Sequence, residues 1–148
     1  MKIILLDLNA TYVENTEVHN LRYGQYNVQA EHYRSWLTKI IKGYPVIMIT
    51  ARPERYRMET LHRIKQLEGW QPMEAYFNDS GLRAPEFKDM VLRTKVFPKH
   101  GKHGEVNRYI ALESNSATRL MYWKHQIIAY TQEQVRVDSS IIEPMTLL

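Results

Sequence analysis

The sequence predicts an open α/β fold with a mainly parallel, Rossmann-like sheet that is covered by helices on both faces. Two observations support this prediction: short apolar runs recur along the chain, and amphipathic helical patterns separate them. A continuous apolar run is expected of a strand that is buried on both faces. The 148 residues suffice for one domain with a full-sized core. We assign residues 1–132 to this domain and residues 133–148 to a C-terminal extension or tail.

Five strands and four helices are expected to alternate. The apolar runs predict strands at residues 3–6, 46–49, 73–77, 108–112 and 127–130. The helical spacing of apolar residues predicts helices at residues 31–42, 53–69, 86–96 and 116–125, with Pro98 as the stop of the third helix. The stretch after Thr131 fits either an extra strand or a loosely held tail.

The composition is that of an ordinary globular protein, with 44% hydrophobic and 24% charged residues. The absence of cysteine excludes disulfides, thiolate metal sites and cysteine nucleophiles. The first apolar run, Ile3 to Leu6, is too short for a signal peptide or a membrane span, so we expect a cytoplasmic protein without a membrane partner. The net charge of +4 favours an anionic partner, such as a phosphate compound or a nucleic acid. The oligomeric state is left open.

Polar residues follow the predicted strands at the edge where open parallel sheets bind ligands. They are Asp7, Asn9, Thr50, Arg52, Asp79, Glu113 and Asn115. Two carboxylates near one another, Asp7 and Glu113, suit Mg²⁺, which prefers oxygen ligands. Thr50 is expected at the start of a helix, where free backbone N–H groups favour a phosphate. Lys88, at another helix start, adds a positive charge. The residues thus predict a site for phosphate and magnesium.

Four motifs resemble those of the haloacid-dehalogenase (HAD) superfamily, in the same order along the chain. The first motif of that family is Asp-x-Asp-x-Thr after an apolar strand, and this chain has Asp-Leu-Asn-Ala-Thr from Asp7 to Thr11. The second is a Thr or Ser that ends an apolar strand, matched by Thr50 in IMIT. The third is a Lys at a helix start, matched by Lys88. The fourth is an acidic pair, matched by residues 113–114 in IALES. The likeness covers residues 1 to about 130.

Within that superfamily, three stretches are similar to the phosphatase domains of bacteriophage polynucleotide kinases. They are TARPERYRMETLHRI, PEFKDMVL and IALESNSATRLMYWKHQIIAY. This resemblance implies a phage source and a substrate that is the phosphate end of a nucleotide or nucleic acid. The short stretch between the first two strands leaves room for a small cap or none, which suits a large substrate.

The resemblance also implies a two-step phosphatase mechanism and a role for each motif residue. Asp7 would attack phosphorus and form an aspartyl-phosphate, which water then hydrolyses. Mg²⁺ would be held by Asp7, the backbone carbonyl of Asn9, and Glu113. Thr50 and Lys88 would stabilise the equatorial phosphate oxygens.

The remaining site residues are expected to contact the substrate. They are Thr11 of the first motif, Arg52 after the second strand and Asn115 after the fourth. Each candidate also has a purely structural interpretation. Asp7 and Thr50 fit ordinary turn positions, Arg52 and Lys88 fit solvated surface positions, and Asn115 fits the cap of the next helix, the role that we favour for it.

Two departures from the family pattern bear on catalysis. Asn9 stands where active members of the family have an acid that protonates the leaving oxygen and later activates water. General acid–base catalysis contributes about 10²–10⁴-fold, and an amide supplies neither step. Glu113-Ser114 replaces an Asp pair, so the metal site loses charge and changes shape. The alternative function is therefore a catalytically degenerate binding module on the same fold.

Other features carry weaker interpretations. The basic segment 99–104 contains His100 and His103, but a solvated loop is favoured over a metal site there. The arginines at positions 52, 55, 57 and 63 fit a charged outer face better than a nucleic-acid surface. The ten tyrosines and three tryptophans could stack on bases, although Tyr33 and Trp36 have core positions by periodicity. The stretch from Glu133 onward is a candidate for self-association.

Overall fold

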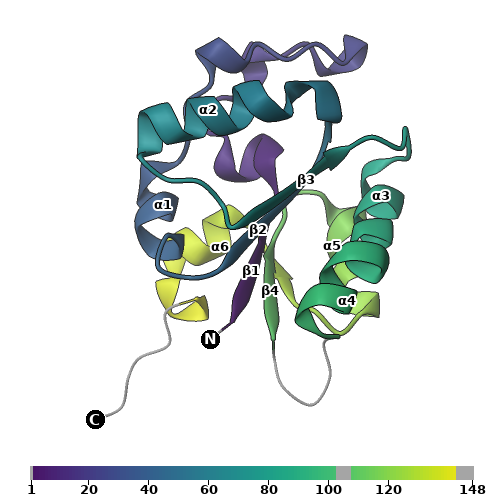
Figure 1. The fold of residues 1–148 in the computed structure, drawn as a ribbon. Helices are drawn as coiled ribbons and strands as arrows, with labels where there is room; N and C mark the ends of the chain where they lie inside the picture. The colour runs from purple at the N-terminus through teal and green to yellow at the C-terminus, as the bar shows by residue number, and fades with distance from the viewer. Residues whose placement is uncertain (1, 103–107, 143–148) are drawn as a thin grey trace.

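The computed structural model describes residues 2–102 and 108–142, and it confirms the α/β class (Figure 1). The strands are β1 (Ile3–Leu6), β2 (Val46–Pro53), β3 (Glu74–Asn78), β4 (Tyr109–Leu112) and β5 (Ala129–Tyr130). They form one parallel sheet in the order β3-β2-β1-β4-β5. The chain winds to one side of β1 through β2 and β3, and then to the other side through β4 and β5. The order therefore reverses at β1, where such sheets bind ligands.

Helices lie on both faces of this sheet. They are α1 (Ser35–Ile41), α2 (Arg57–Glu68), α3 (Ala84–Val91), α4 (Phe97–His100), α5 (Ser116–Lys124) and α6 (Gln132–Val137). Short helical turns also occur, at η1 (Leu8–Tyr12), η2 (Thr16–Val18), η3 (Leu21–Tyr23), η4 (Val28–Ala30), η5 (Glu54–Tyr56), η6 (Leu92–Val96) and η7 (Ser139–Ile141). Figure 1 shows α1, α2 and α6 on one side of the sheet and α3, α4 and α5 on the other.

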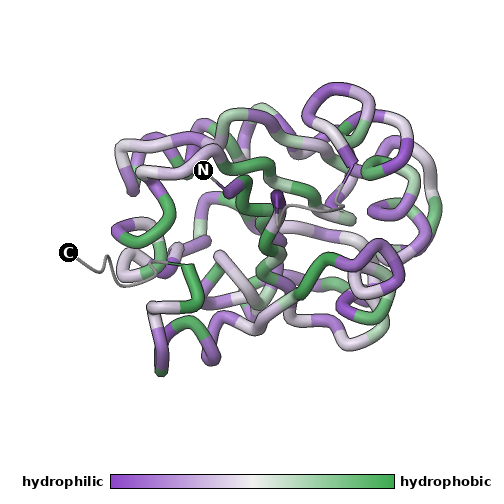
Figure 2. The backbone as a smooth tube through the Cα atoms, turned by 90° about the horizontal axis from the view of Figure 1, so that it is seen from below, coloured by the Kyte–Doolittle hydropathy of each residue, from purple (hydrophilic) through white to green (hydrophobic). Residues whose placement is uncertain are grey.

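Alternate residues of each central strand fill two separate cores, because successive side chains in a strand point to opposite faces. Ile4 and Leu6 of β1 pack with residues of α1, α2 and α6, whereas Ile3 and Leu5 pack with residues of α3 and α5. Apolar residues follow the strands through the middle of the molecule in Figure 2. Burial on both faces explains why β1 reads as a continuous apolar run.

Two elements differ from the sequence-based expectations. Strand β2 continues past Ile49 to Pro53, and α2 begins only at Arg57, after the turn η5. The expected helix start directly after Thr50 is therefore wrong, because the chain stays extended there. Pro98 does not stop a helix; it lies in the first turn of α4, where its missing N–H costs nothing.

The residues after Thr131 form a helix, α6, and not a strand. Thr131 and Gln134 make a reciprocal capping box, in which each side chain binds the backbone N–H of the other residue. Val135 and Ile142 are buried in the core that also contains α1 and α2. The C-terminal stretch is thus packed against the sheet as far as it is described.

The segment between η1 and α1 is small, as the sequence predicted. It contains only the turns η2, η3 and η4, and in Figure 1 it lies across the end of the molecule to which the strand arrows point. Within the described ranges, no helix is long and apolar enough to cross a membrane.

Candidate active site

Asp7 lies directly after β1 at the edge where the strand order reverses. Its backbone N–H donates to the carbonyl of Leu112 on β4 at 3.0 Å, and only 8% of the residue is exposed. The chain then turns sharply through Ala10, whose φ of 59° is a left-handed conformation uncommon for a residue other than glycine. This turn returns Thr11 to the strand end, where its hydroxyl donates to Asp7 Oδ2 at 2.8 Å.

Lys88 joins Asp7 to Glu113 across the site. The Lys88 ammonium donates to Asp7 Oδ1 at 2.8 Å and to Glu113 Oε1 at 2.6 Å, and 1% of Lys88 is exposed. Burial acts to lower the pKa of Lys88, but the negative charges of Asp7 and Glu113 outweigh it and raise the pKa. Lys88 is therefore a fixed, buried cation, in the second turn of α3 and not at its start.

Glu113 ends β4 beside Asp7 and is likewise buried, with 2% exposed. Its Oε2 accepts a hydrogen bond from the backbone N–H of Asn115 at 3.1 Å. Burial raises the pKa of Glu113 to about 7; the Lys88 charge acts to lower it, and the Asp7 charge acts to raise it further. One buried cation between two carboxylates leaves the cluster one negative charge in excess, which suits an added cation or an incoming proton.

Ser114 lies between Asp7 and the chain that follows it. Its hydroxyl is 3.2 Å from Asp7 Oδ2 and 3.3 Å from the backbone carbonyl of Asn9. A carboxylate, a carbonyl and a hydroxyl oxygen thus converge from two strand ends. Mg²⁺ accepts such a set, because it binds one or two carboxylates and keeps several waters. The described residues contain no group of three or more His, Cys, Asp or Glu suited to a metal.

The side chain of Asn9 points to a second cluster. Asn9 Oδ1 accepts from Arg52 Nη2 at 2.9 Å, and Asn9 Nδ2 donates to the Tyr26 hydroxyl at 3.3 Å. The backbone carbonyl of Asn9 faces Ser114 and the side chain faces Arg52. The use of the Asn9 carbonyl as a metal ligand stays a prediction.

Arg52 is completely buried and forms the centre of this second cluster. It forms an ion pair with both carboxylate oxygens of Glu31 and donates to the Thr60 hydroxyl at 2.9 Å. Glu31 also accepts from the Tyr33 hydroxyl at 2.8 Å and lies 2.6 Å from His19 Nε2. The substrate contact predicted for Arg52 stays a prediction, since its guanidinium is bound to protein groups.

Glu31, His19 and Tyr26 were missed by the sequence reasoning. They belong to the segment between η1 and α1, which has no apolar periodicity that would orient its side chains. No short motif marks Glu31, His19 and Tyr26, because their contacts join positions far apart in the chain. In the same cluster, Arg52 Nε is buried and has no hydrogen-bond partner among the described residues.

Two remaining candidates support local structure. The Thr50 hydroxyl accepts from the backbone N–H of Arg52 at 3.1 Å and holds the extended end of β2. Asn115 caps α5, with its Oδ1 accepting from the backbone N–H of Thr118 at 3.0 Å, which confirms the capping role. The phosphate contact of Thr50 and the substrate contact of Asn115 stay predictions. His100 contacts Glu74, whereas His103 lies outside the described residues.

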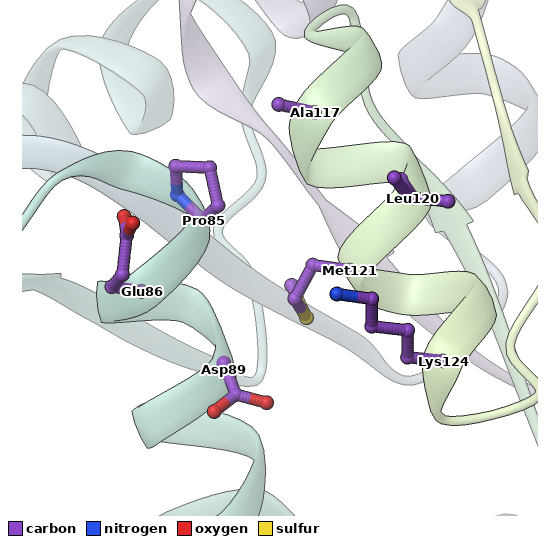
Figure 3. Close-up of a pocket in the computed structure, with 7 residues that line it drawn as sticks. All are labelled: Pro85, Glu86, Asp89, Ala117, Leu120, Met121 and Lys124. Atoms are coloured by element: carbon purple, nitrogen blue, oxygen red, sulfur yellow. The ribbon is translucent and has the colours of Figure 1, made fainter.

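A hollow of about 300 Å³ lies between α3 and α5, apart from the Asp7 cluster. Figure 3 shows its lining, with Glu86 and Asp89 on α3 and with Leu120, Met121 and Lys124 on α5. None of these side chains belongs to the site at the strand ends.

Comparisons with known proteins support the fold. No protein-family model matches the chain, and no curated protein matches it either. Two solved structures of the Pnkp1/Rnl/Hen1 RNA repair complex contain similar chains, with TM-scores of 0.65 and 0.58 and sequence identities of 15% and 14%. Each match covers 88% of this chain but only 42% and 45% of the other chain. The chain therefore shares its fold with less than half the length of proteins in an RNA repair complex.

Proposed function

We propose that the protein is a Mg²⁺-dependent phosphohydrolase that acts on the phosphate end of a nucleotide or nucleic acid. The observation that carries this proposal is the buried contact of Lys88 with both Asp7 and Glu113 at the switch point of the sheet. A carboxylate held beside a fixed cation is suited to attack phosphorus while the cation balances charge on the phosphate oxygens. The RNA repair complexes that share the fold support a nucleic-acid substrate.

In the proposed reaction, a carboxylate oxygen of Asp7 attacks phosphorus, and the bond from phosphorus to the leaving oxygen breaks. The leaving oxygen takes a proton from solvent, since Asn9 has none to give as an acid. Water then attacks the aspartyl-phosphate, which releases inorganic phosphate and restores Asp7. Lys88 stabilises the negative oxygens in both steps, and Thr11 keeps the Asp7 carboxylate oriented through its hydrogen bond.

Bound Mg²⁺ would contribute charge neutralisation on the transferring phosphoryl group. Asp7 Oδ2, the Asn9 carbonyl and the Ser114 hydroxyl are the oxygens that would hold it, with Glu113 beside them. Glu113 reaches the cation only if it exchanges its contacts with Lys88 and Asn115.

The test is hydrolysis of 3′-phosphorylated oligonucleotides and of a small phosphate ester with Mg²⁺, for the wild type and Asp7→Asn. Asp138→Asn, at an exposed position after α6, is the matched control. We expect Asp7→Asn to abolish turnover and Asp138→Asn to retain it. Isothermal titration with Mg²⁺ supplies a second readout, in which Asp7→Asn weakens binding. Equal turnover by the wild type and Asp7→Asn would refute the proposal.

The second candidate is a binding module without catalysis, and the position of Asn9 favours it. The amide is held by Arg52 and Tyr26 and can neither protonate the leaving oxygen nor activate water. This candidate predicts that the wild type binds phosphorylated ends without hydrolysing them. Turnover by the wild type at ordinary rates would exclude it.

A further inference from the structure

A group of aromatic and basic side chains, some exposed and some half-buried, lies beside the site, on η3, on the loop after it, and on η5. This group, the aromatic platform, consists of Arg22, Tyr23, Tyr26, Arg55 and Tyr56. We propose that the aromatic platform binds a single strand of nucleic acid, RNA or DNA, whose phosphate end lies at Asp7. The inference rests on the proposed function and names the form of the substrate.

Contacts join the two parts of the chain that supply the platform. The Tyr26 and Tyr56 rings are 5.1 Å apart between centroids, and the Arg55 guanidinium lies 4.8 Å from the Tyr56 ring. Arg55 Nη2 also donates to the Gly24 carbonyl at 3.3 Å, which joins η5 to the turn after η3. Figure 1 shows the segment that contains η3 above the start of α2, at the end of the molecule where the strands finish.

Solvent reaches the outer part of this surface. Tyr23 is 66% exposed, with the Arg22 guanidinium 5.7 Å from its ring centroid. Arg22 and Arg55 are both exposed. By contrast, Arg57 binds Glu54 and the Ala75 carbonyl, so its charge is already matched by the protein. The outer part of the platform therefore offers the exposed ring of Tyr23 together with two accessible cations, Arg22 and Arg55.

The inner end of the platform touches the Asp7 site. The Tyr26 hydroxyl accepts from Asn9 Nδ2, and the Asn9 carbonyl and Asp7 Oδ2 share the Ser114 hydroxyl. A strand with its terminal phosphate at Asp7 would thus pass Tyr26, which is half-buried and has the Arg52 guanidinium 4.5 Å from its ring centroid, on its way to the exposed Tyr23.

The chemistry of the platform matches a single strand better than a duplex. Aromatic rings stack on the faces of unpaired bases regardless of their identity, and arginines contact the phosphates. In a duplex those base faces are already stacked inside the helix. The hollow between α3 and α5 is a poorer site for an anionic strand, because the carboxylates of Glu86 and Asp89 line it (Figure 3).

The experiment measures binding by fluorescence anisotropy of labelled oligonucleotides of about 12 nucleotides, a length within the range that single-strand sites cover. Single-stranded RNA, single-stranded DNA and a blunt duplex, each with a 3′-phosphate, are titrated with the full chain carrying Asp7→Asn, so that no turnover occurs. We expect single strands to bind more tightly than the duplex, with little dependence on base sequence. The RNA and DNA arms show which sugar the site prefers.

Substitutions in the platform locate the binding surface. We expect Tyr23→Ala to weaken single-strand binding about 5- to 150-fold, the usual effect of removing one stacking ring. The matched control is Trp123→Ala, which removes another exposed ring on α5 and is expected to leave binding unchanged. The double variant Arg22→Ala/Arg55→Ala should reduce the slope of log affinity against log salt by about 1.4, from about 0.7 per phosphate contact. Arg93→Ala/Arg136→Ala, two exposed arginines elsewhere, is its control.

The outcomes separate this inference from the proposed function. Equal effects of Tyr23→Ala and Trp123→Ala, or tighter binding of the duplex, would overturn the platform even if Asp7-dependent hydrolysis is observed. Platform-dependent binding of single strands without any hydrolysis would leave the surface intact and refute the phosphatase. Thermal unfolding of each variant distinguishes a loss of affinity from a loss of fold.

Discussion

The Lys88 ammonium donates to Asp7 Oδ1 at 2.8 Å across a separation of 81 positions in the sequence. The same nitrogen reaches Glu113, so α3 is joined to the ends of both central strands. A buried charge of this kind is stable only while its partners remain, because desolvation is costly for an unpaired ion. Lys88 is therefore expected to contribute both to the proposed chemistry and to the stability of the fold.

Removing the Lys88 charge should destabilise the protein. Lys88→Met leaves two carboxylates buried close together, and we expect a loss of about 3–5 kcal/mol in the free energy of unfolding. Urea denaturation followed by circular dichroism measures the loss. Lys124→Met, an exposed substitution on α5, is the control and should change stability by about 0.5 kcal/mol at most. If the two variants are equally stable, Lys88 is not the buried ion described above.

Arg52 should be important for stability for the same reason. Arg52→Met removes the partner of the buried Glu31 carboxylate, and we expect a cost of about 3–5 kcal/mol in the same denaturation experiment. Arg136→Met, whose side chain is 65% exposed, should cost little. A small effect of Arg52→Met would mean that Glu31 is satisfied without the ion pair.

An acid placed at position 9 tests whether the lack of a proton carrier there limits catalysis. Asn9→Asp introduces the missing proton carrier, and Arg52 Nη2, 2.9 Å from Asn9 Oδ1, is in place to hold the new carboxylate. We expect kcat for a phosphate ester to rise by about 10²–10⁴-fold. Asn9→Ser, which supplies no acid, is the control. No gain in Asn9→Asp, alone or with Ser114→Asp, would show that another residue limits turnover.

The contacts of Glu74 predict a pH dependence of stability. Burial acts to raise the pKa of Glu74, but hydrogen bonds from Lys99, His100 and Tyr76 outweigh it and lower the pKa below its usual 4.5. A carboxyl with a lowered pKa in the folded state stabilises the protein above about pH 4.5, and that stability is lost as the pH falls further.

The measurement is the difference in unfolding free energy between the wild type and Glu74→Gln as a function of pH. We expect a difference that is constant at neutral pH and shrinks below about pH 4.5. Glu86→Gln, at an exposed position on α3, should show no such change. A difference that grows on acidification would contradict the assignment.

The C-terminal helix should contribute to the stability of the domain. Val135 is completely buried and Val137 is 79% exposed on the same helix. We expect Val135→Ala to cost about 1–3 kcal/mol, from lost burial and the remaining cavity, and Val137→Ala to be close to neutral. Thermal unfolding compares the two. Equal melting temperatures would mean that α6 folds and unfolds apart from the rest of the chain.

Much of the architecture could be predicted from local patterns. The apolar runs around Leu5 and Ile47 require burial on both faces, and parallel pairing with crossover helices is the usual way to provide it. The carboxyl ends of parallel strands meet at one edge of the sheet. Asp7 and Glu113 are therefore expected close together, because both directly follow neighbouring strands. Lys88 was predicted as a site residue from the order of the motifs, and in the structure it contacts both carboxylates.

Other features could not be predicted, because they depend on contacts between distant segments. The orientation of Asn9 depends on Arg52 and Tyr26, which lie 43 and 17 positions away in the sequence. The extended end of β2 follows from its pairing with β3, which overrode the expected helix start. The position of α6 depends on the space that α1 and α2 leave for Val135.

The sequence by itself determined the central strands, their two-sided burial and the edge at which Asp7 and Glu113 lie together, since continuous apolar runs and parallel pairing constrain these strongly. Only the tertiary structure decided which charges are neutralised inside the protein and which remain available. Arg52 and Arg55 are close in sequence, yet the first is buried with Glu31 and the second is exposed on the aromatic platform. The physical reason is that burial of a charge depends on a partner from elsewhere in the chain, and no local pattern identifies that partner.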